Sequence, residues 1–448
     1  MRKPFRIALV LATAAVVIVL YAAASLLRSL DTPEFKARVA REASAVVGAR
    51  VQLDSLNVSL LRGIRLGGVR VQNPPGWNGN LLSAETARLS YSPWSLLRGR
   101  IVVDELTVRK PVVTLQSDAR GVFNYQRLSA QTSARAAAPA PASAGLLSLV
   151  VSKLSVEGAR LAITDQKNAA ILRLDEGSLV SALGMDSGVL SGTGEARIES
   201  VVLTNALFLR GVRAPIKLTR ERLSLAPLQA TLAGGAVKGD IAVGFKPDLR
   251  YTLKVAVTGA SVATLLKEAG SAGTLTGALD SQATIRGTGG LLTLEGEGQA
   301  EIKDCRWPKS SLFSLLADVL KLPELKDPRF DECRVQFVIA GGQARTPVVA
   351  FKGPALELTG EGATSLQTTA LDYDLTLALS PGLLARVPAP MQAGFKRRTD
   401  GFGVIPFKVT GTAAAPKTDL AARFGKAVAI EAAKEGLLGR LFGKKKQE

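Results

Sequence analysis

The chain has 448 residues, of which 47% are hydrophobic and only 5% aromatic, and its formal net charge is +19. It has no histidine, which excludes Ser-His-Asp and Cys-His catalysis and histidine-ligated metals. No phosphate-binding glycine loop, G-x-S-x-G turn or metal-ligand spacing is present. We therefore predict no enzyme, no catalytic residues, no metal and no cofactor. The basic residues alternate with apolar ones, which indicates solvated strand faces and no nucleic acid partner.

The N-terminus predicts a membrane anchor. Residues 1–6 are short and basic, and residues 7–27 carry no charge. At 1.5 Å per residue the apolar run spans about 31 Å, close to the roughly 30 Å of a bilayer's hydrocarbon core. The basic end should stay in the cytoplasm, so that the rest of the chain is exported. A cleavable signal peptide is the alternative, since Ala22 to Ala24 are small, but the apolar run is longer than usual for one.

A short amphipathic helix is predicted next. Asp31 or Thr32 can cap it, Pro33 suits its first turn, and Gly48 suits its end. Its apolar face is predicted to contain Phe35, Val39, Ala43 and Val46.

From about residue 50 the hydrophobic period changes to two, which predicts antiparallel strands. One helix-plus-strand module is expected over residues 28–128, and a longer strand region over 146–419, with helical insertions at Ser261–Ala269 and Lys309–Leu322. Residues 129–145 are rich in Ala, Pro and Ser, which is typical of a linker or exposed loop. Residues 420–448 form a basic helix candidate that either rests on an anionic membrane surface or frays in water.

Residues 230–257 and 350–379 resemble each other, and each has a glycine-rich turn followed by three strands. Their alternation puts apolar side chains on one face, which must be covered. The sheet either closes over a dry core or forms an open groove for acyl chains. Periodicity alone favours the dry core. The groove candidates are Tyr251, Leu253, Val255, Val257, Phe337, Tyr373, Leu375 and Leu377.

The two cysteines, Cys305 and Cys333, flank the second helical insertion. Outside the cytoplasm such a pair either forms a disulfide or remains as two thiols. A disulfide would close the loop 305–333 and add about 3–4 kcal/mol to stability.

Both ends of the chain resemble the AsmA-like family of bacterial envelope proteins. The N-terminal resemblance rests on GIRLGGVRVQNPPGW, on LLRGRIVV, on the strand after Pro111, and on a D-x-x-G-x-x-N element at Asp118, Gly121 and Asn124. The C-terminal one rests on LELTGEGATSLQTTALDYDLTLAL and IPFKVTGTAAAPKTDL.

The resemblance implies a mainly β fold. It would be an elongated, curved, taco-like antiparallel groove with a few short helices, preceded by one transmembrane helix and similar to chorein-type bridge proteins. It also implies a single-pass inner-membrane protein with a cytoplasmic N-terminus and a periplasmic body. Its partners would be membrane phospholipids, the inner membrane and an outer-membrane or envelope protein.

With the resemblance, the open groove becomes the favoured alternative. The function that it implies is phospholipid binding and transfer in envelope and outer-membrane biogenesis. A non-enzymatic scaffold or assembly factor for outer-membrane proteins, with a closed β core, is the alternative.

Overall fold

The computed structural model describes residues 33–59, 63–91, 102–118, 122–128, 150–165, 170–186, 189–204, 206–245, 250–271, 274–288, 293–412, 415–420 and 422–424. The expected anchor 7–27, the expected linker 129–145 and most of the segment 420–448 lie outside this range. No helix within it has the length and apolar character needed to span a bilayer. The fold is mainly β, as predicted, and it divides into two units, Met1–Leu232 with Val237–Leu253, and Ala233–Ala236 with Lys254–Glu448.

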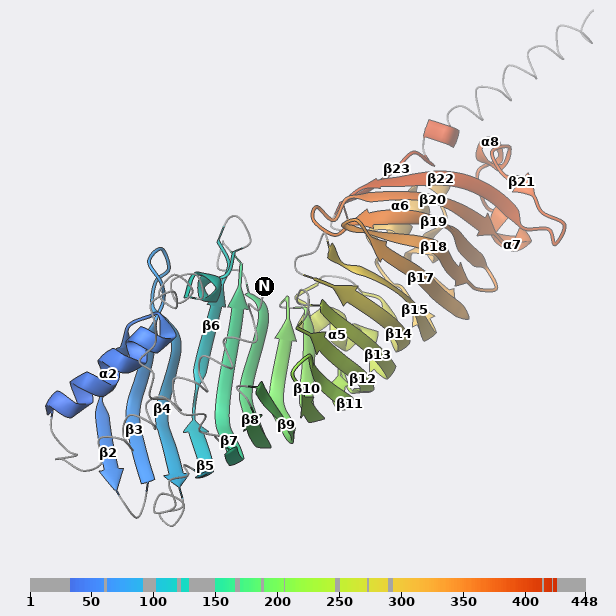
Figure 1. Ribbon diagram of the computed structural model, residues 1–448. Helices are drawn as coiled ribbons and strands as arrows, with labels where there is room; N and C mark the ends of the chain where they lie inside the picture. Colours follow the sequence, from blue (N-terminus) through green and yellow to red (C-terminus); the bar gives the residue numbers. More distant parts are fainter. Residues whose placement is uncertain are drawn as a thin grey trace, which may run out of the picture. The chain divides into compact units, whose positions relative to one another are not determined.

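The first unit begins with one helix, α2 (Pro33–Val47), and continues as strands (Figure 1). These are β1 (Val51–Gln52), β2 (Ser55–Ser59), β3 (Gly63–Gln72), β4 (Asn80–Tyr91), β5 (Val102–Arg109), β6 (Val112–Gln116), β7 (Val150–Thr164), β8 (Ala170–Asp186), β9 (Val189–Leu203), β10 (Leu207–Leu218) and β11 (Arg222–Leu232). Residues of β12 (Gly235–Gly244) and β13 (Arg250–Ser261) belong to both units.

The helix predicted after the anchor is confirmed. Gly48 has a φ of +75°, which favours glycine and ends α2. Val39, Ala43 and Val47 are buried in one cluster with apolar residues of the first strands, including Ile64. The helix therefore covers the apolar face of β3 and β4, across which it lies in Figure 1.

The pairing of β7 departs from the predicted antiparallel pattern. β7 runs parallel to both β5 and β6, which also both pair with β4. Pro111 separates β5 from β6, so the two short strands share one position between β4 and β7. A parallel pair needs a long crossover, and residues 117–149 supply enough chain for it. Periodicity of two does not distinguish parallel from antiparallel pairing.

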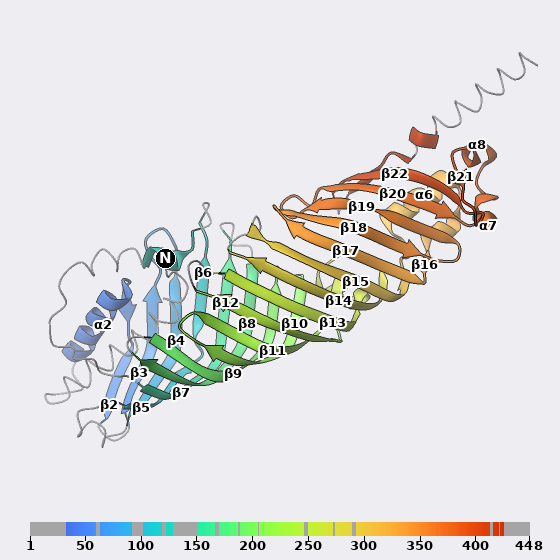
Figure 2. The ribbon, with the colours of Figure 1, turned by 45° about the vertical axis from the view of Figure 1, so that its right-hand side comes forward.

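The second unit contains most of the remaining elements (Figure 2). They are α5 (Val262–Glu268), β14 (Thr276–Gly287), β15 (Glu295–Arg306), α6 (Ser311–Leu320), the 3-10 helix η2 (Pro323–Lys326), β16 (Arg329–Phe330), β17 (Glu332–Ala340), β18 (Gln343–Lys352), β19 (Leu356–Ser365), β20 (Leu371–Leu379), α7 (Pro381–Leu384), α8 (Ala389–Gln392), β21 (Lys396–Arg397), β22 (Gly403–Gly411) and β23 (Pro416–Thr418). From β14 to β23 the pairings are antiparallel.

Both predicted helical insertions are present, as α5 and α6. Ser261 caps α5 by accepting a hydrogen bond from the backbone N–H of Thr264. α6 buries Phe313, Leu316 and Leu320 in a cluster with residues of β17–β22. Cys305 of β15 and Cys333 of β17 form a disulfide in this cluster, with their Cα atoms 6.4 Å apart.

The outer edge of β22 is covered along its length. β21 pairs with Val404, and β23 pairs with Thr410. Between them, the Asp419 carboxylate accepts a hydrogen bond from the backbone N–H of Lys408 at 2.7 Å, and the backbone N–H of Asp419 donates to the Lys408 carbonyl. Pro406 has no N–H to offer.

Candidate functional site

The register of the second unit defines one apolar and one polar face. Directly paired residues of neighbouring strands share a face. One row across β14, β15, β17, β18, β19, β20 and β22 consists of Ser281, Ala300, Val335, Val349, Gly360, Leu375 and Phe407. The adjacent row, on the opposite face, consists of Asp280, Glu301, Arg334, Ala350, Thr359, Thr376 and Pro406.

The apolar face is closed in one part and exposed in another. Where α6 lies over it, Phe351, Leu358 and Leu377 belong to the buried cluster. On β14 and β17 the apolar residues of the same face remain half-buried. These are Leu279, Ile285, Phe337 and Ile339. The sheet therefore has a dry core beneath α6 and a partly exposed apolar surface beside it.

On the exposed part of this face, aromatic rings lie flat over glycines of the paired strands. Gly298 pairs with Phe337, and a Cβ on Gly298 would lie 2.4 Å from the Phe337 ring. Gly362 pairs with Tyr373, and a Cβ there would likewise lie 2.4 Å from the ring. Each ring thus occupies the space that a neighbouring side chain would fill. Such a floor presents flat apolar surface to a ligand.

The Tyr373 hydroxyl brings polar groups to the edge of the apolar face. It lies 3.1 Å from the Thr346 hydroxyl and 2.9 Å from the Thr364 hydroxyl. Thr346 is buried, so this contact satisfies a hydroxyl that would otherwise be costly to bury.

The eight predicted groove residues fall into different environments. Leu375 and Leu377 are 6% and 0% exposed and lie in the closed core. Tyr373, Phe337 and Val255 are half-buried. Tyr251 and Leu253, which lie on β13 within the first unit, are also half-buried. Val257 is half-buried and also lines a polar hollow described below.

Sequence reasoning did not single out Leu279 and Ile285 of β14. Their spacing along LDSQATI alternates apolar and polar residues, which is the signal that could have found them. Small residues between them, Ser281 and Ala283, weaken that alternation.

The first unit has the same two-faced character. Leu179, Ala196 and Ala214 form one row of its apolar face. Ile198 lies two residues after Ala196 on β9, so it is on the same face. Both alanines are buried, whereas Leu179 and Ile198 are half-buried. Its closed core is the cluster beneath α2.

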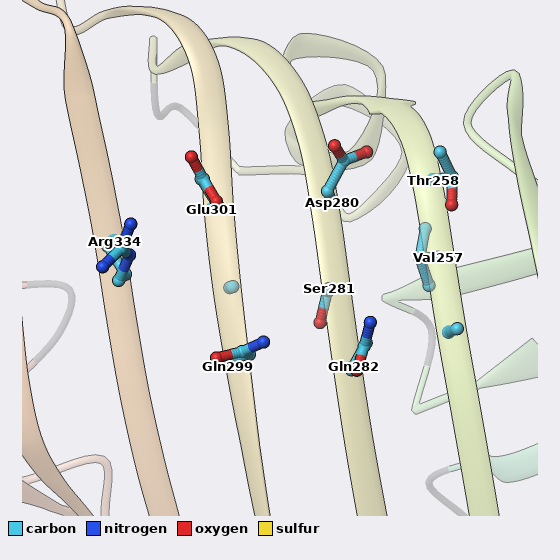
Figure 3. Close-up of a pocket in the computed structure, with 10 residues that line it drawn as sticks. Val257, Thr258, Asp280, Ser281, Gln282, Gln299, Glu301 and Arg334 are labelled. Carbon is cyan, nitrogen blue, oxygen red and sulfur yellow. The ribbon is translucent and has the colours of Figure 1, made fainter.

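A separate hollow of about 340 Å³ lies against β13, β14, β15 and β17 (Figure 3). Its charged lining residues, Asp280, Glu301 and Arg334, belong to the polar row, and Ser281 and Ala300 of the other row also border it. Gln282 and Gln299 also line it. These side chains offer hydrogen bonds to a polar group but no nucleophile paired with a base. Within the described part of the chain, no three acidic, cysteine or histidine residues gather as metal ligands.

The Asp280 carboxylate is held by two donors. The Lys303 ammonium lies 2.7 Å from it, and the backbone N–H of Gly259 donates to it at 2.8 Å. The hydrogen bond from Lys303, with that from Gly259, lowers the pKa of Asp280 below its ordinary value. The same pairing raises the pKa of Lys303. Asp280 therefore joins β14 to the end of β13, which is a structural role.

These features define a class of protein: a two-faced β-sheet protein whose apolar face is closed by helices in places and half-exposed in others. The AsmA family model matches residues 1–180. This match confirms the family resemblance, and the chain is AsmA-like over that region. No curated protein and no solved structure matches the chain.

Proposed function

We propose that this chain is an inner-membrane-anchored envelope protein whose periplasmic β-sheet binds and transfers phospholipids on its apolar face. The observation that carries the proposal is the half-exposed apolar surface formed by residues such as Ile285, Phe337 and Ile339, beside a closed core. Contiguous apolar surface exposed to water is unfavourable. In a soluble body it commonly marks a binding surface.

Acyl chains suit this surface. They need no hydrogen bonds, and a floor in which rings lie over Gly298 and Gly362 allows close approach. The charged row on the opposite face keeps that side in water. The match to the AsmA family over residues 1–180 supports an envelope role, because the resemblance to that family implies a bacterial envelope protein. The uncharged run at residues 7–27 supports an anchor.

Site-specific photocrosslinking in cells tests the proposal on the full chain. The photoreactive residue p-benzoylphenylalanine replaces Ile339 in one variant and the adjacent Val338 in a matched control. Ile339 pairs with Gly296 on the apolar face, whereas Val338 pairs with Glu297 on the polar face and is 44% exposed. Cells grown with radiolabelled phosphate are irradiated, and the chain is purified under denaturing conditions.

We expect a radiolabelled phospholipid adduct at Ile339 and much less at Val338. Equal labelling at both positions would mean that the chain contacts lipid without using the apolar face, and would reject the proposal. Protein adducts at Ile339 without lipid would also reject it, and would favour the scaffold alternative.

A further inference from the structure

Two arginines face each other on the polar side of the first unit. Arg65 of β3 pairs directly with Arg88 of β4, and both are exposed. Asn57 of β2, also exposed, is the next residue in the same row. The neighbouring rows carry Ile64 and Leu66, which belong to the cluster under α2. The arginines thus lie on the sheet face opposite α2.

These two arginines differ from other arginines on β3 and on the neighbouring strand β5. Arg70 of β3 forms an ion pair with Asp54, and Arg109 of β5 lies 3.3 Å from the Glu157 carboxylate. Within the described residues, no hydrogen bond or ion pair is recorded for the guanidinium groups of Arg65 and Arg88.

A neighbouring carboxylate, that of Glu105, is already engaged. Glu105 is diagonal to Arg88 and feels its charge, but its carboxylate lies 2.9 Å from the Lys153 ammonium and accepts a hydrogen bond from Thr107. Hydrogen bonding from Lys153, the largest influence, lowers the pKa of Glu105. The charge of Glu105 is therefore largely balanced by Lys153.

Like charges directly opposite each other in a sheet are destabilising. A group with two or more acceptor oxygens placed between the guanidinium groups would remove that repulsion. Phosphate fits best, because guanidinium groups bind phosphate oxygens in bidentate fashion. The Asn57 amide adds a neutral donor beside them.

We propose that Arg65, Arg88 and Asn57 form a binding site for the phosphate headgroup of an anionic membrane lipid. The choice of a lipid rests on the proposed function, because α2 begins six residues after the expected anchor ends at residue 27. Six residues span at most about 20 Å. α2 packs on the same strands that carry the two arginines. The site is therefore held within reach of the membrane surface.

The test measures binding of water-soluble dihexanoyl phosphatidylglycerol to the full chain in a neutral detergent. The variant is Arg65→Gln with Arg88→Gln. The matched control is Arg38→Gln with Arg41→Gln, which removes the same charge from exposed positions of α2. We expect the first variant to bind about 10-fold more weakly and the control to stay within about twofold. Dihexanoyl phosphatidylcholine and inorganic phosphate at equal ionic strength serve as comparison ligands.

A structural role would give a different pattern. Because the substitutions remove repulsion, the Arg65→Gln and Arg88→Gln variant should melt no lower than the wild type. Arg88→Lys keeps the positive charge but loses the planar guanidinium group that can form two parallel hydrogen bonds to a phosphate. This variant should therefore bind the lipid with intermediate affinity.

Equal weakening in both double variants would overturn the proposal in favour of general charge attraction. Binding of inorganic phosphate but not of the lipid would overturn the headgroup assignment. Crosslinking at Ile339 is independent of these arginines, so its persistence would show that only the headgroup site had failed.

Discussion

Tyr373 shows at the scale of one residue how a polar atom is tolerated on an apolar face. Its ring covers Gly362, and its hydroxyl lies within hydrogen-bond distance of two threonine hydroxyls, Thr364 on the adjacent strand β19 and Thr346 on β18 beyond it. Alternation along β20 places the ring on the apolar face. The threonine partners were not predictable, because a register shift between Thr346 and Val349 changes the alignment of β18 with β19.

Asp280 carries a prediction about pH. Its pKa is lower in the folded chain than the ordinary value of about 3.9. The ionised carboxylate therefore stabilises the fold above that pH, and this contribution is lost as the pH falls through the folded pKa. Asp280→Asn should lower the urea midpoint at neutral pH, and the difference from the wild type should shrink in acid.

Lys303→Gln provides the check, because Lys303 is the main cause of the shift. In the Lys303→Gln background, Asp280→Asn should lower the free energy of unfolding by less than it does in the wild-type chain. Fully additive effects in urea unfolding of the full chain would show that the two side chains do not stabilise each other.

At the scale of elements, the helices and the antiparallel pairing of most strands were predicted, but the parallel pairing of β7 was not. Proline near the start and glycine just past the end specify α2, and an apolar run specifies α6. The parallel pairing of β7 depends on contacts across a long connection, which local periodicity does not encode. The position of α6 over the apolar face also had no local signal, although it decides that Leu375 and Leu377 lie in the core.

The two faces of α6 give a matched pair of substitutions. Phe313 is fully buried between strands and helix, whereas Leu315, two residues later, is 41% exposed. Phe313→Ala should destabilise the chain by about 3–5 kcal/mol because it leaves a cavity. Leu315→Ala should change stability by no more than about 0.5 kcal/mol. Urea unfolding of the full chain measures both, and similar losses would mean that α6 does not pack as described.

At the scale of the whole molecule, the sequence predicted a mainly β chain with an apolar face but not the parts of that face that remain exposed. Exposure depends on which strands α2 and α6 cover, which is a tertiary property. The predicted candidates Phe337 and Val255 are half-buried, while two others are enclosed. Periodicity identifies the face of a residue, and packing determines its access to a ligand.

The covered edge of β22 should prevent copies of the chain from associating through strand pairing at this edge. Asp419→Ala with Pro406→Val would free the backbone N–H of Lys408 and add one at position 406. Exposed strand edges pair with other chains, so the variant should self-associate more strongly in sedimentation velocity. As a control, Asp372→Ala removes the same charge from an exposed position of β20 and should leave the sedimentation coefficient unchanged. Unchanged sedimentation of the edge variant would contradict this account.

The Lys408 N–H points outward, so positions 404, 406 and 410 present their backbone on the same side of β22. Val404 pairs with β21 and Thr410 pairs with β23, Pro406 has no N–H, and the Lys408 N–H donates to the Asp419 carboxylate. Among the residues that the structure describes, β22 itself therefore has no outward-facing amide left with which to pair an additional strand. The hydrogen-bond ladder of β22 therefore cannot be extended directly, so fibrillar growth along this strand is disfavoured, and a polypeptide that binds beside β22 must do so through side chains.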